Sequence, residues 1–281
     1  MSSLFGAIDE ALARGESVAL VTIVRAQGST PQRVGARMLV YEDGRTIGTI
    51  GGGCYEQDAF GKARLALQTG RPTLAHYDLN DDFAEEQGLI CGGQMDVFID
   101  PIAPTPRVFI VGAGHVGYHT AQLAATVGFR VVVVDDRASF ADAGRFPTAE
   151  RVDVAEIPEW LATADIGPRD YLVIVTRGHR EDLDALRAAL TRETAYIGLI
   201  GSRAKIARLQ ARLDSDDLID RFATVHAPIG LDLGAVSPEE IAVSIVAELI
   251  AHRRGRLQAT PAESAPPRRA RSLQWRPPAL R

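Results

Sequence analysis

The sequence predicts two α/β domains of different architecture: a small N-terminal α+β domain, followed by a doubly wound parallel-sheet domain. A chain of 281 residues suits two domains of ordinary size. Three prolines interrupt the chain within residues 101–106. From Arg107 onward, short apolar strands alternate with helical segments, which is typical of a parallel sheet. We therefore place the first domain at residues 1–103 and the second at residues 107–255.

The composition excludes several classes of protein. Apolar residues make up 46% of the chain, enough to build real cores, and the net charge of −5 argues against a general nucleic-acid binder, which should be basic. No run of 18 apolar residues occurs, so we expect no membrane span. The N-terminus reads as an amphipathic helix and not as a signal peptide. Two cysteines in so long a chain argue against a disulfide scaffold and fit a reducing cytoplasm, where we expect the protein.

The elements of the first domain are read from hydrophobic periodicity and turn signals. Residues 17–25 are rich in β-branched side chains, and Asp43-Gly44 is a hairpin signal between two short strands. The sequence predicts helices over residues 2–14 and 54–69, and strands over 17–25, 36–41, 45–50, 72–78 and 94–100.

A glycine run leading into a cysteine is the most informative stretch of this domain. In Gly51-Gly52-Gly53-Cys54 the glycines let the backbone turn and approach a ligand closely, and Cys54 falls in the first turn of the predicted helix. Free N–H groups and the helix dipole there favour a thiolate with a lowered pKa. Cys54 is then a reactive or metal-binding sulfur beside an anion cradle; the alternative is a tight turn before a buried cysteine. Cys91-Gly92-Gly93 repeats the pattern.

A polar loop precedes the hairpin, over residues 26–35. It carries the hydroxyls of Ser29 and Thr30 and the guanidinium of Arg33. Such a loop could hold a phosphate or the edge of a pterin, or it could be a plain connection.

The second domain opens with a dinucleotide-binding pattern. A strand from Arg107 leads to the turn Gly112-x-Gly114-x-x-Gly117, a helix, and a second strand that ends at Asp135. In a Rossmann-like fold an acid at this spacing binds the ribose, and Asp135 would favour NAD over NADP. The glycines are also needed for helix–strand packing, so the pattern predicts the fold more firmly than a bound nucleotide.

The remaining elements complete this domain. Ser237, Pro238 and Glu240 form the pattern of an N-cap, an N1 proline and a capping box before a long helix. The sequence predicts strands over residues 150–154, 170–176, 195–200 and 222–225, and helices over 180–192, 202–213 and 237–252. The Pro- and Arg-rich tail, residues 256–281, is predicted to be disordered.

Ligands of such sheets bind beyond the carboxyl ends of the strands, where the strand order reverses. We expect that point between the first and fourth strands, so His115, Arg177 and His179 should face one crevice. Arg177 could bind a phosphate, and His179 could be an acid, a base, a metal ligand or a helix-start residue bonded to the backbone. The helix that starts after Gly201-Ser202 is a further possible anion site, or a solvated basic face.

Taken together, these residues resemble the XdhC/CoxI family of xanthine dehydrogenase accessory proteins over about residues 4–254. The matching motifs are Gly28-Ser29-Thr30-Pro31, Gly51-Gly52-Gly53-Cys54 with Glu56, Cys91-Gly92-Gly93, Gly112–Gly117, Thr176-Arg177-Gly178-His179, residues 196–203, His226-Ala227-Pro228-Ile229-Gly230-Leu231 and the helix from Pro238.

The resemblance implies a maturation chaperone and not an enzyme. Members of the family bind the molybdenum cofactor, a pyranopterin whose dithiolene holds molybdenum, support its sulfuration with a cysteine desulfurase, and deliver it to apo-xanthine dehydrogenase. Cys54 would bind the metal or carry the sulfur, and Cys91 could join it. Glu56 would be among the residues that bind the cofactor. Ser29, Thr30 and Arg33, or the helix start after Gly53, would hold the phosphate. We also expect a homodimer, because the small first domain needs a partner surface.

Two other functions stay open. The glycine pattern of the second domain is compatible with an NAD(P)-dependent oxidoreductase, or with a nucleotide or part of the molybdenum cofactor held in that crevice. A protein-interaction module, in which every glycine motif is structural, is the third possibility.

Overall fold

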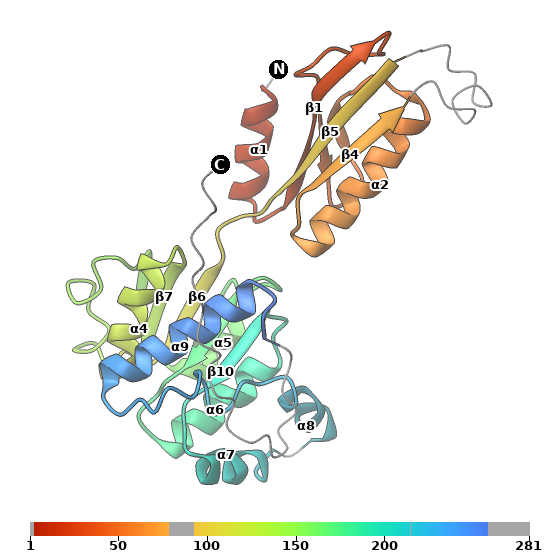
Figure 1. Cartoon of the computed structure of the whole chain (residues 1–281). Helices are drawn as coiled ribbons and strands as arrows, with labels where there is room; N and C mark the ends of the chain where they lie inside the picture. Colours follow the sequence, from red (N-terminus) through yellow and green to blue (C-terminus); the bar gives the residue numbers. More distant parts are fainter. Residues whose placement is uncertain (1–2, 79–92, 214, 258–281) are drawn as a thin grey trace, which may run out of the picture. The chain divides into compact units, whose positions relative to one another are not determined.

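The computed structural model describes residues 3–78, 93–213 and 215–257 (Figure 1). The chain divides into two compact units, Met1–Pro104 and Thr105–Arg281. Each unit is described by itself below. The predictions made for Cys91 and for residues 258–281 of the tail lie outside the described residues.

The first unit is an antiparallel sheet with strand order β3-β2-β1-β5-β4. Its long central strand pairs with β2 on one side and with β5 on the other. The elements are α1 (Leu4–Ala13), β1 (Val18–Gly28), β2 (Arg37–Tyr41), β3 (Thr46–Gly48), α2 (Gly53–Thr69), β4 (Thr73–Asp78) and β5 (Gly93–Ile102).

Alternation along the strands sends apolar side chains to both faces of this sheet. Ala19, Val21 and Ile23 of β1 face the buried side of α2, whereas Val18 packs with α1 on the opposite face. The segment 26–28, predicted as loop, continues β1, because it pairs with β5 down to the Gly28–Gly93 pair. The strand therefore carries the start of the polar loop to the end of the sheet.

The second unit is a parallel sheet with strand order β10-β9-β6-β7-β8. The first and fourth strands along the chain, β6 and β9, are neighbours, so the strand order reverses where the sequence predicts the crevice. The strands are β6 (Arg107–Val111), β7 (Arg130–Asp135), β8 (Arg151–Val154), β9 (Tyr171–Ile174) and β10 (Tyr196–Leu199).

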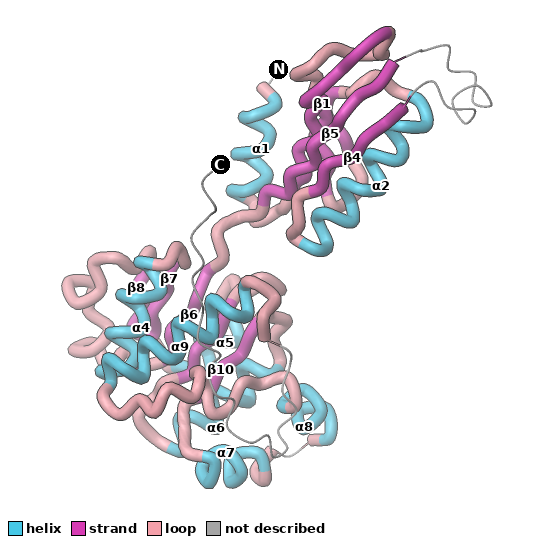
Figure 2. The backbone as a smooth tube through the Cα atoms, viewed as in Figure 1, coloured by secondary structure: helices cyan, strands magenta, loops and turns pink. Residues whose placement is uncertain are grey.

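Helices cover both faces of this sheet, which confirms the doubly wound class. Val108 and Ile110 of β6 point to the core beneath α4 and α9, which lie side by side in Figure 2. Phe109 and Val111 point to the core shared with the other helices. The predicted capping box starts α9. The helices are α4 (His115–Thr126), α5 (Ile157–Thr163), α6 (His179–Leu190), α7 (Arg203–Gln210), α8 (Asp216–Phe222) and α9 (Pro238–Arg253).

The prediction of a strand over residues 222–225 is wrong. Phe222 ends α8, and only His226 forms an isolated bridge, to Gly198 of β10. Phe222 and Val225 are both buried in the core. Their spacing of three residues suits a helix end and the turn after it as well as it suits a strand. The short helices α5 and α8 were not predicted.

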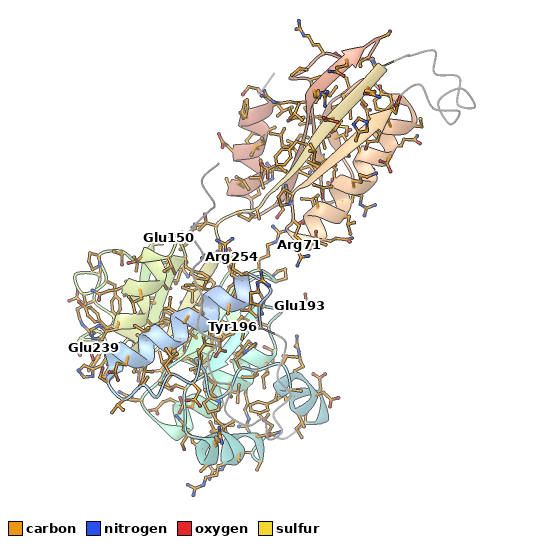
Figure 3. All side chains as sticks on the ribbon, viewed as in Figure 1. Arg71, Glu150, Glu193, Tyr196, Glu239 and Arg254 are labelled. Carbon is orange, nitrogen blue, oxygen red and sulfur yellow. The ribbon has the colours of Figure 1, made fainter. Side chains whose placement is uncertain are left out.

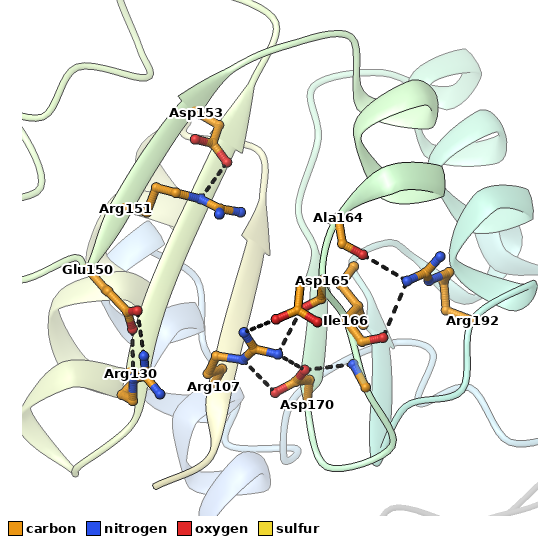
Figure 4. Close-up of polar contacts among 11 residues, drawn as sticks. Arg107, Arg130, Glu150, Arg151, Asp153, Ala164, Asp165, Ile166, Asp170 and Arg192 are labelled. Atoms are coloured by element: carbon orange, nitrogen blue, oxygen red, sulfur yellow. Dashed lines mark hydrogen bonds and ion pairs between the residues drawn. The ribbon is translucent and has the colours of Figure 1, made fainter. Parts of the chain in front are cut away.

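One guanidinium anchors the start of the parallel sheet. Arg107 Nε and Nη2 donate to the two carboxylate oxygens of Asp170 at 3.0 and 2.7 Å, and Nη1 donates to Asp165 Oδ2 at 3.0 Å (Figure 4). The hydrogen bonds to Asp170 and Asp165 outweigh burial and raise the pKa of Arg107. Both aspartates precede β9, so these bonds tie β6 to β9 at the edge where both strands begin.

Candidate functional site

Three glycine motifs meet at one end of the antiparallel sheet. Gly93 lies opposite Gly28, and a Cβ at Gly93 would stand 2.6 Å from the carbonyl oxygen of Gln27 and 2.7 Å from that of Ser29. A Cβ at Gly51 would stand 2.7 Å from Pro31 Cβ. The structure thus brings the loop after β1 against both the Gly51 turn and the glycine that begins β5, and only glycine fits at the two contacts.

Cys54 lies at this junction. Gly51, Gly52 and Gly53 have φ values of 126°, 78° and 81°, which side chains other than glycine rarely adopt. Gly52 is the N-cap of α2 and Cys54 is the second residue of the helix, as predicted. Its side chain is half-buried, and the thiol is free. Backbone N–H groups at such a position have no acceptor within the helix.

Glu56 fills the anion cradle formed by the residues before Cys54. Its Oε2 atom accepts hydrogen bonds from the hydroxyl of Thr49 at 2.6 Å and from the N–H groups of Ile50, Gly52 and Gly51 at 2.8, 3.0 and 3.2 Å. Burial opposes ionisation of this carboxyl group, but the hydrogen bonds outweigh it and lower the pKa of Glu56. The cradle therefore holds an anion that belongs to the chain itself.

The polar loop after β1 borders the same turn. Ser29 and Arg33 are exposed, and Thr30 is half-buried and donates its hydroxyl proton to the carbonyl oxygen of Gln32 at 2.9 Å. The candidate phosphate-binding side chains are therefore close in the chain to Pro31, which contacts Gly51.

A second polar group on α2 was not predicted. Asp58 follows Cys54 by four residues, so both lie on one face of the helix. Asp58 Oδ2 accepts the hydroxyl proton of Tyr77 at 2.8 Å and pairs with Lys62. Burial and the neighbouring carboxylate raise the pKa of Tyr77. The spacing of Cys54, Asp58 and Lys62, each four residues apart, could have signalled this group in the sequence.

In the second unit the glycines pack the first strand against its helix. A Cβ at Gly117 would stand 1.9 Å from the carbonyl oxygen of Gly112, and a Cβ at Gly112 would stand 2.6 Å from that of Val175. Gly114 is the N-cap of α4, with open space around it. Two of the three glycines are thus required by packing alone, and Gly114 is the one where a ligand could approach.

Asp135 is buried and bound by its own chain. Its Oδ2 accepts the N–H of Ala113 at 2.8 Å, and the guanidinium of Arg137 donates to both carboxylate oxygens, at 2.8 Å to Oδ1 and 2.9 Å to Oδ2. Burial works against ionisation, but these bonds prevail and lower the pKa of Asp135 to about 2. Arg137 also covers the ring of Phe140 at 3.6 Å. A ribose hydroxyl at Asp135 would have to displace Arg137.

The crevice residues lie on three different segments of this edge. Arg177 pairs with Asp136 at 2.8 Å and with Glu181 at 3.2 Å, which places the loop after β9 beside the segment after β7. His115 is exposed at the start of α4. His179 begins α6, and its side chain lies outside what the structure describes.

Lys205, in the helix that starts after Gly201-Ser202, has a structural role. Lys205 pairs with Asp182, which is completely buried, and the other oxygen of Asp182 accepts the hydroxyl proton of Thr176 at 2.5 Å. The lysine therefore neutralises a buried charge. Ser202 caps the same helix by accepting the N–H of Lys205 at 3.2 Å.

A buried aromatic and titratable cluster lies under α9. Tyr196, labelled in Figure 3, donates its hydroxyl proton to Glu248 Oε1 at 2.7 Å and stacks on His226, whose Nδ1 lies 3.0 Å from the same oxygen. His252 contacts Tyr171 and Tyr196 edge-on. Burial, followed by the charge of His226, lowers the pKa of His252. The sequence signal for this cluster was Glu248, a carboxylate among the apolar residues in the second half of α9.

Neither a metal cluster nor a membrane span is present in the described part of the chain. Within residues 3–78, 93–213 and 215–257, no group of three or more His, Cys, Asp or Glu side chains is arranged to hold a metal ion. Among the helices described, none is long and apolar enough to cross a membrane.

A Rossmann-type unit, preceded by a sheet unit in which a glycine turn leads into a cysteine, defines a class of two-domain protein, and comparison with known families agrees. Residues 108–249 match the XdhC Rossmann domain, and residues 11–78 match the XdhC and CoxI family. The chain belongs to the XdhC and CoxI family, which confirms the resemblance read from its motifs.

Similar proteins occur in several bacteria. The chain is 36% identical to YqeB of Escherichia coli K12 over 83% of its own length but only 43% of that protein, so it spans less than half of YqeB. It is 27% identical to a protein of Bacillus subtilis 168 named as a probable xanthine dehydrogenase subunit, covering 90% of this chain and 98% of that one. It is 24% identical to the molybdenum cofactor insertion chaperone PaoD of E. coli K12, covering 87% and 86%.

A solved structure shares the fold. The crystal structure of a protein described as a xanthine dehydrogenase from Bacillus halodurans matches with a TM-score of 0.50 and 28% identity, over 89% of this chain and 96% of that one.

Proposed function

We propose that this protein binds the molybdenum cofactor as cargo, supports its sulfuration, and inserts it into an enzyme of the xanthine dehydrogenase type. The observation that carries the proposal is the half-buried, free Cys54 at the start of α2, directly after the Gly51–Gly53 turn that the loop after β1 contacts. The family, and relatives named as an insertion chaperone and as part of a xanthine dehydrogenase, point the same way.

The chemistry of these residues suits such a cargo. A cysteine sulfur is a soft ligand, so Cys54 can bind molybdenum or carry a sulfur atom to it. The cofactor's own dithiolene holds the metal otherwise. Gly52, two residues before Cys54, has no heavy atom within 4 Å of where its Cβ would stand, so a flat pterin can approach the backbone there.

The cofactor's phosphate needs a separate anion site. Because Glu56 already occupies the N–H groups of residues 50–52, the candidates are the exposed Ser29 and Arg33 and the helix start after Gly53. In this proposal the protein is a chaperone with no chemical step of its own beyond sulfur handling. Its partners are apo-xanthine dehydrogenase and a cysteine desulfurase, and it acts as a homodimer in the cytoplasm.

Expression in a host that makes the cofactor tests the proposal. Purified protein should carry molybdenum and pterin in near-equal amounts, measured by elemental analysis and by fluorescence of the oxidised pterin. We expect Cys54→Ala to retain at least tenfold less of both. Cys91→Ala shows whether the second cysteine joins the site. Equal retention by Cys54→Ala and the parent would refute the thiol role.

An NAD(P)-dependent oxidoreductase is the second candidate, and it rests on the Gly112–Gly117 turn. Gly114 leaves open space at the start of α4, which favours approach of a phosphate. The bonds of Asp135 to Ala113 and Arg137 weigh against a ribose at that carboxylate. Titration with NADH and NADPH, followed by nicotinamide fluorescence, tests for a bound nucleotide, and a reductase assay separates the two functions, because the chaperone role predicts no reductase activity.

A further inference from the structure

We propose that Glu56 is a positioning residue: it acts as a built-in counter-anion that fixes the Gly51–Gly53 turn and thereby the place of Cys54, and it does not touch the cargo. This inference rests on the proposed function only for what Cys54 binds. The bonding of Glu56 is independent of that function.

One oxygen atom of Glu56 accepts hydrogen bonds from all four residues of the segment 49–52. Oε2 of Glu56 lies within 3.2 Å of four donors, three of them consecutive backbone N–H groups. The hydroxyl of Thr49 serves twice, since it donates to Glu56 and accepts the N–H of Gly51 at 2.9 Å. An oxygen with this many donors is saturated, so a cargo atom has no place in the cradle while Glu56 holds it.

The turn needs such a partner to keep one shape. Three consecutive glycines at positive φ lose more conformational freedom on ordering than any other tripeptide would. The N–H groups of Ile50, Gly51 and Gly52 converge on one point, which is unfavourable unless an anion sits there. Glu56 supplies it from the first turns of α2, a rigid helix of 17 residues.

The hydrogen bonds from residues 49–52 to Glu56 close a loop that contains Cys54. Ile50, on one side, is completely buried in the core under α2, and Glu56, on the other side, bonds back to residues 49–52. The loop closed by these bonds contains Gly53 and Cys54. Fixing both of its ends restricts where the sulfur can lie, and loss of the carboxylate would release it.

The experiment uses the full chain and four variants. Glu56→Ala removes the anion, Glu56→Gln keeps an acceptor oxygen without the charge, and Thr49→Val removes one donor. The control is Glu16→Gln, which removes a carboxylate of the same unit that pairs with Arg14 on the surface. The first readout is amide hydrogen exchange in peptides covering residues 50–54, and the second is retention of molybdenum and pterin.

We expect exchange at residues 50–52 to rise at least tenfold in Glu56→Ala and less in Glu56→Gln and Thr49→Val, with cargo retention falling in the same order. Sodium formate, a small carboxylate, should slow the exchange again in Glu56→Ala and restore retention, whereas formamide should not. Glu16→Gln should match the parent in both readouts.

The results that would overturn the proposal are distinct from those that would refute the proposed function. Lost cargo with unchanged exchange at residues 50–52 would mean that Glu56 contacts the cargo, and absence of formate rescue would mean that no anion site is left behind. A parent protein without molybdenum or pterin would refute the proposed function, yet exchange and formate rescue would still decide the role of Glu56. If Glu56→Ala does not fold, Glu56→Gln and Thr49→Val decide it by their exchange rates.

Discussion

The two glycine-rich turns, one in each unit, are both closed by a carboxylate of the chain. Glu56 binds the N–H groups before Cys54, and Asp135 binds the N–H of Ala113 in the turn after β6. In each case the residue was predicted to face a ligand, and in each case it faces the backbone. A glycine motif therefore identifies a close approach of groups without saying whether the approaching group is a ligand or a side chain.

The difference between the turns lies in how each carboxylate is held. Glu56 comes from the same helix, is half-buried and depends on N–H and O–H donors alone. Asp135 comes from the next strand, is almost wholly buried, and is neutralised by Arg137. The first carboxylate thus orders the turn before Cys54, whereas the second is part of a packed, ion-paired support.

The largest effect is expected from Gly117→Ala. The new Cβ would overlap the carbonyl oxygen of Gly112, which lies 1.9 Å away and belongs to the backbone, so the strand or the helix must shift. We expect the free energy of unfolding of the second unit to fall by about 4 kcal/mol, at the upper end for overpacking. Urea unfolding followed by the fluorescence of Trp160, which packs on Phe109 of β6, measures it. An effect below about 1 kcal/mol would mean that the glycine is not required by packing.

Asp135→Ala should come next. It leaves the N–H of Ala113 and the guanidinium of Arg137 without their shared partner in a buried place. We expect a loss of about 3 kcal/mol, as is usual when one member of a buried pair is removed. The same urea experiment applies, with Asp142→Ala, an exposed aspartate of this unit, as the control. Equal stability of Asp135→Ala and the parent would contradict the supporting role.

The pH dependence of that loss follows from the lowered pKa. Asp135 has a pKa of about 2 in the folded chain against 3.8 for an ordinary aspartate, so its contribution is fully present above the unfolded value and is lost as the pH falls from 3.8 through 2. The stability difference between the parent and Asp135→Asn should therefore be constant at pH 5 and above, and should shrink by roughly 2 kcal/mol on acidification. A difference that grows in acid would mean that folding raises the pKa of Asp135 instead of lowering it.

The smallest effect is expected from Gly114→Ala. No heavy atom lies within 4 Å of a Cβ at this position, and φ is −67°, so neither overlap nor strain arises. Exchanging an N-cap glycine for alanine should cost less than about 1 kcal/mol. If a nucleotide approaches this turn, Gly114→Ala should weaken its binding in a titration without a matching loss of stability. A large loss of stability would place Gly114 with Gly117 as a packing residue.

Local patterns predicted much of the fold. The Gly112–Gly117 turn between a strand and a helix fixed the start of the parallel sheet, and Ser237-Pro238 with Glu240 marked the start of α9 correctly, because caps and turns depend on neighbouring residues. The strand predicted at residues 222–225 failed because two apolar residues three apart fit either element, and burial of Phe222 by other helices decided between them.

The partners of the site residues could not be predicted in the same way. Whether Glu56 turns back to residues 50–52 depends on the φ values of three glycines, which the sequence permits but does not dictate. The engagement of Asp135 by Arg137, two residues later, requires both the end of β7 and the turn after β6 to be in place. The roles of Cys54 and Cys91 toward a cargo remain predictions that the proposed binding assays test.

The built-in anion at Glu56 bears on how a carrier can be emptied. A pocket that collapses when its cargo leaves must be reopened before the next loading, and the free energy of reopening lowers its affinity for the cargo. The Gly51–Gly53 turn is already satisfied by four donors to one oxygen of the chain. If Glu56 fixes the turn as proposed, the turn keeps this shape with and without cargo, so loading and unloading would each proceed without refolding the site.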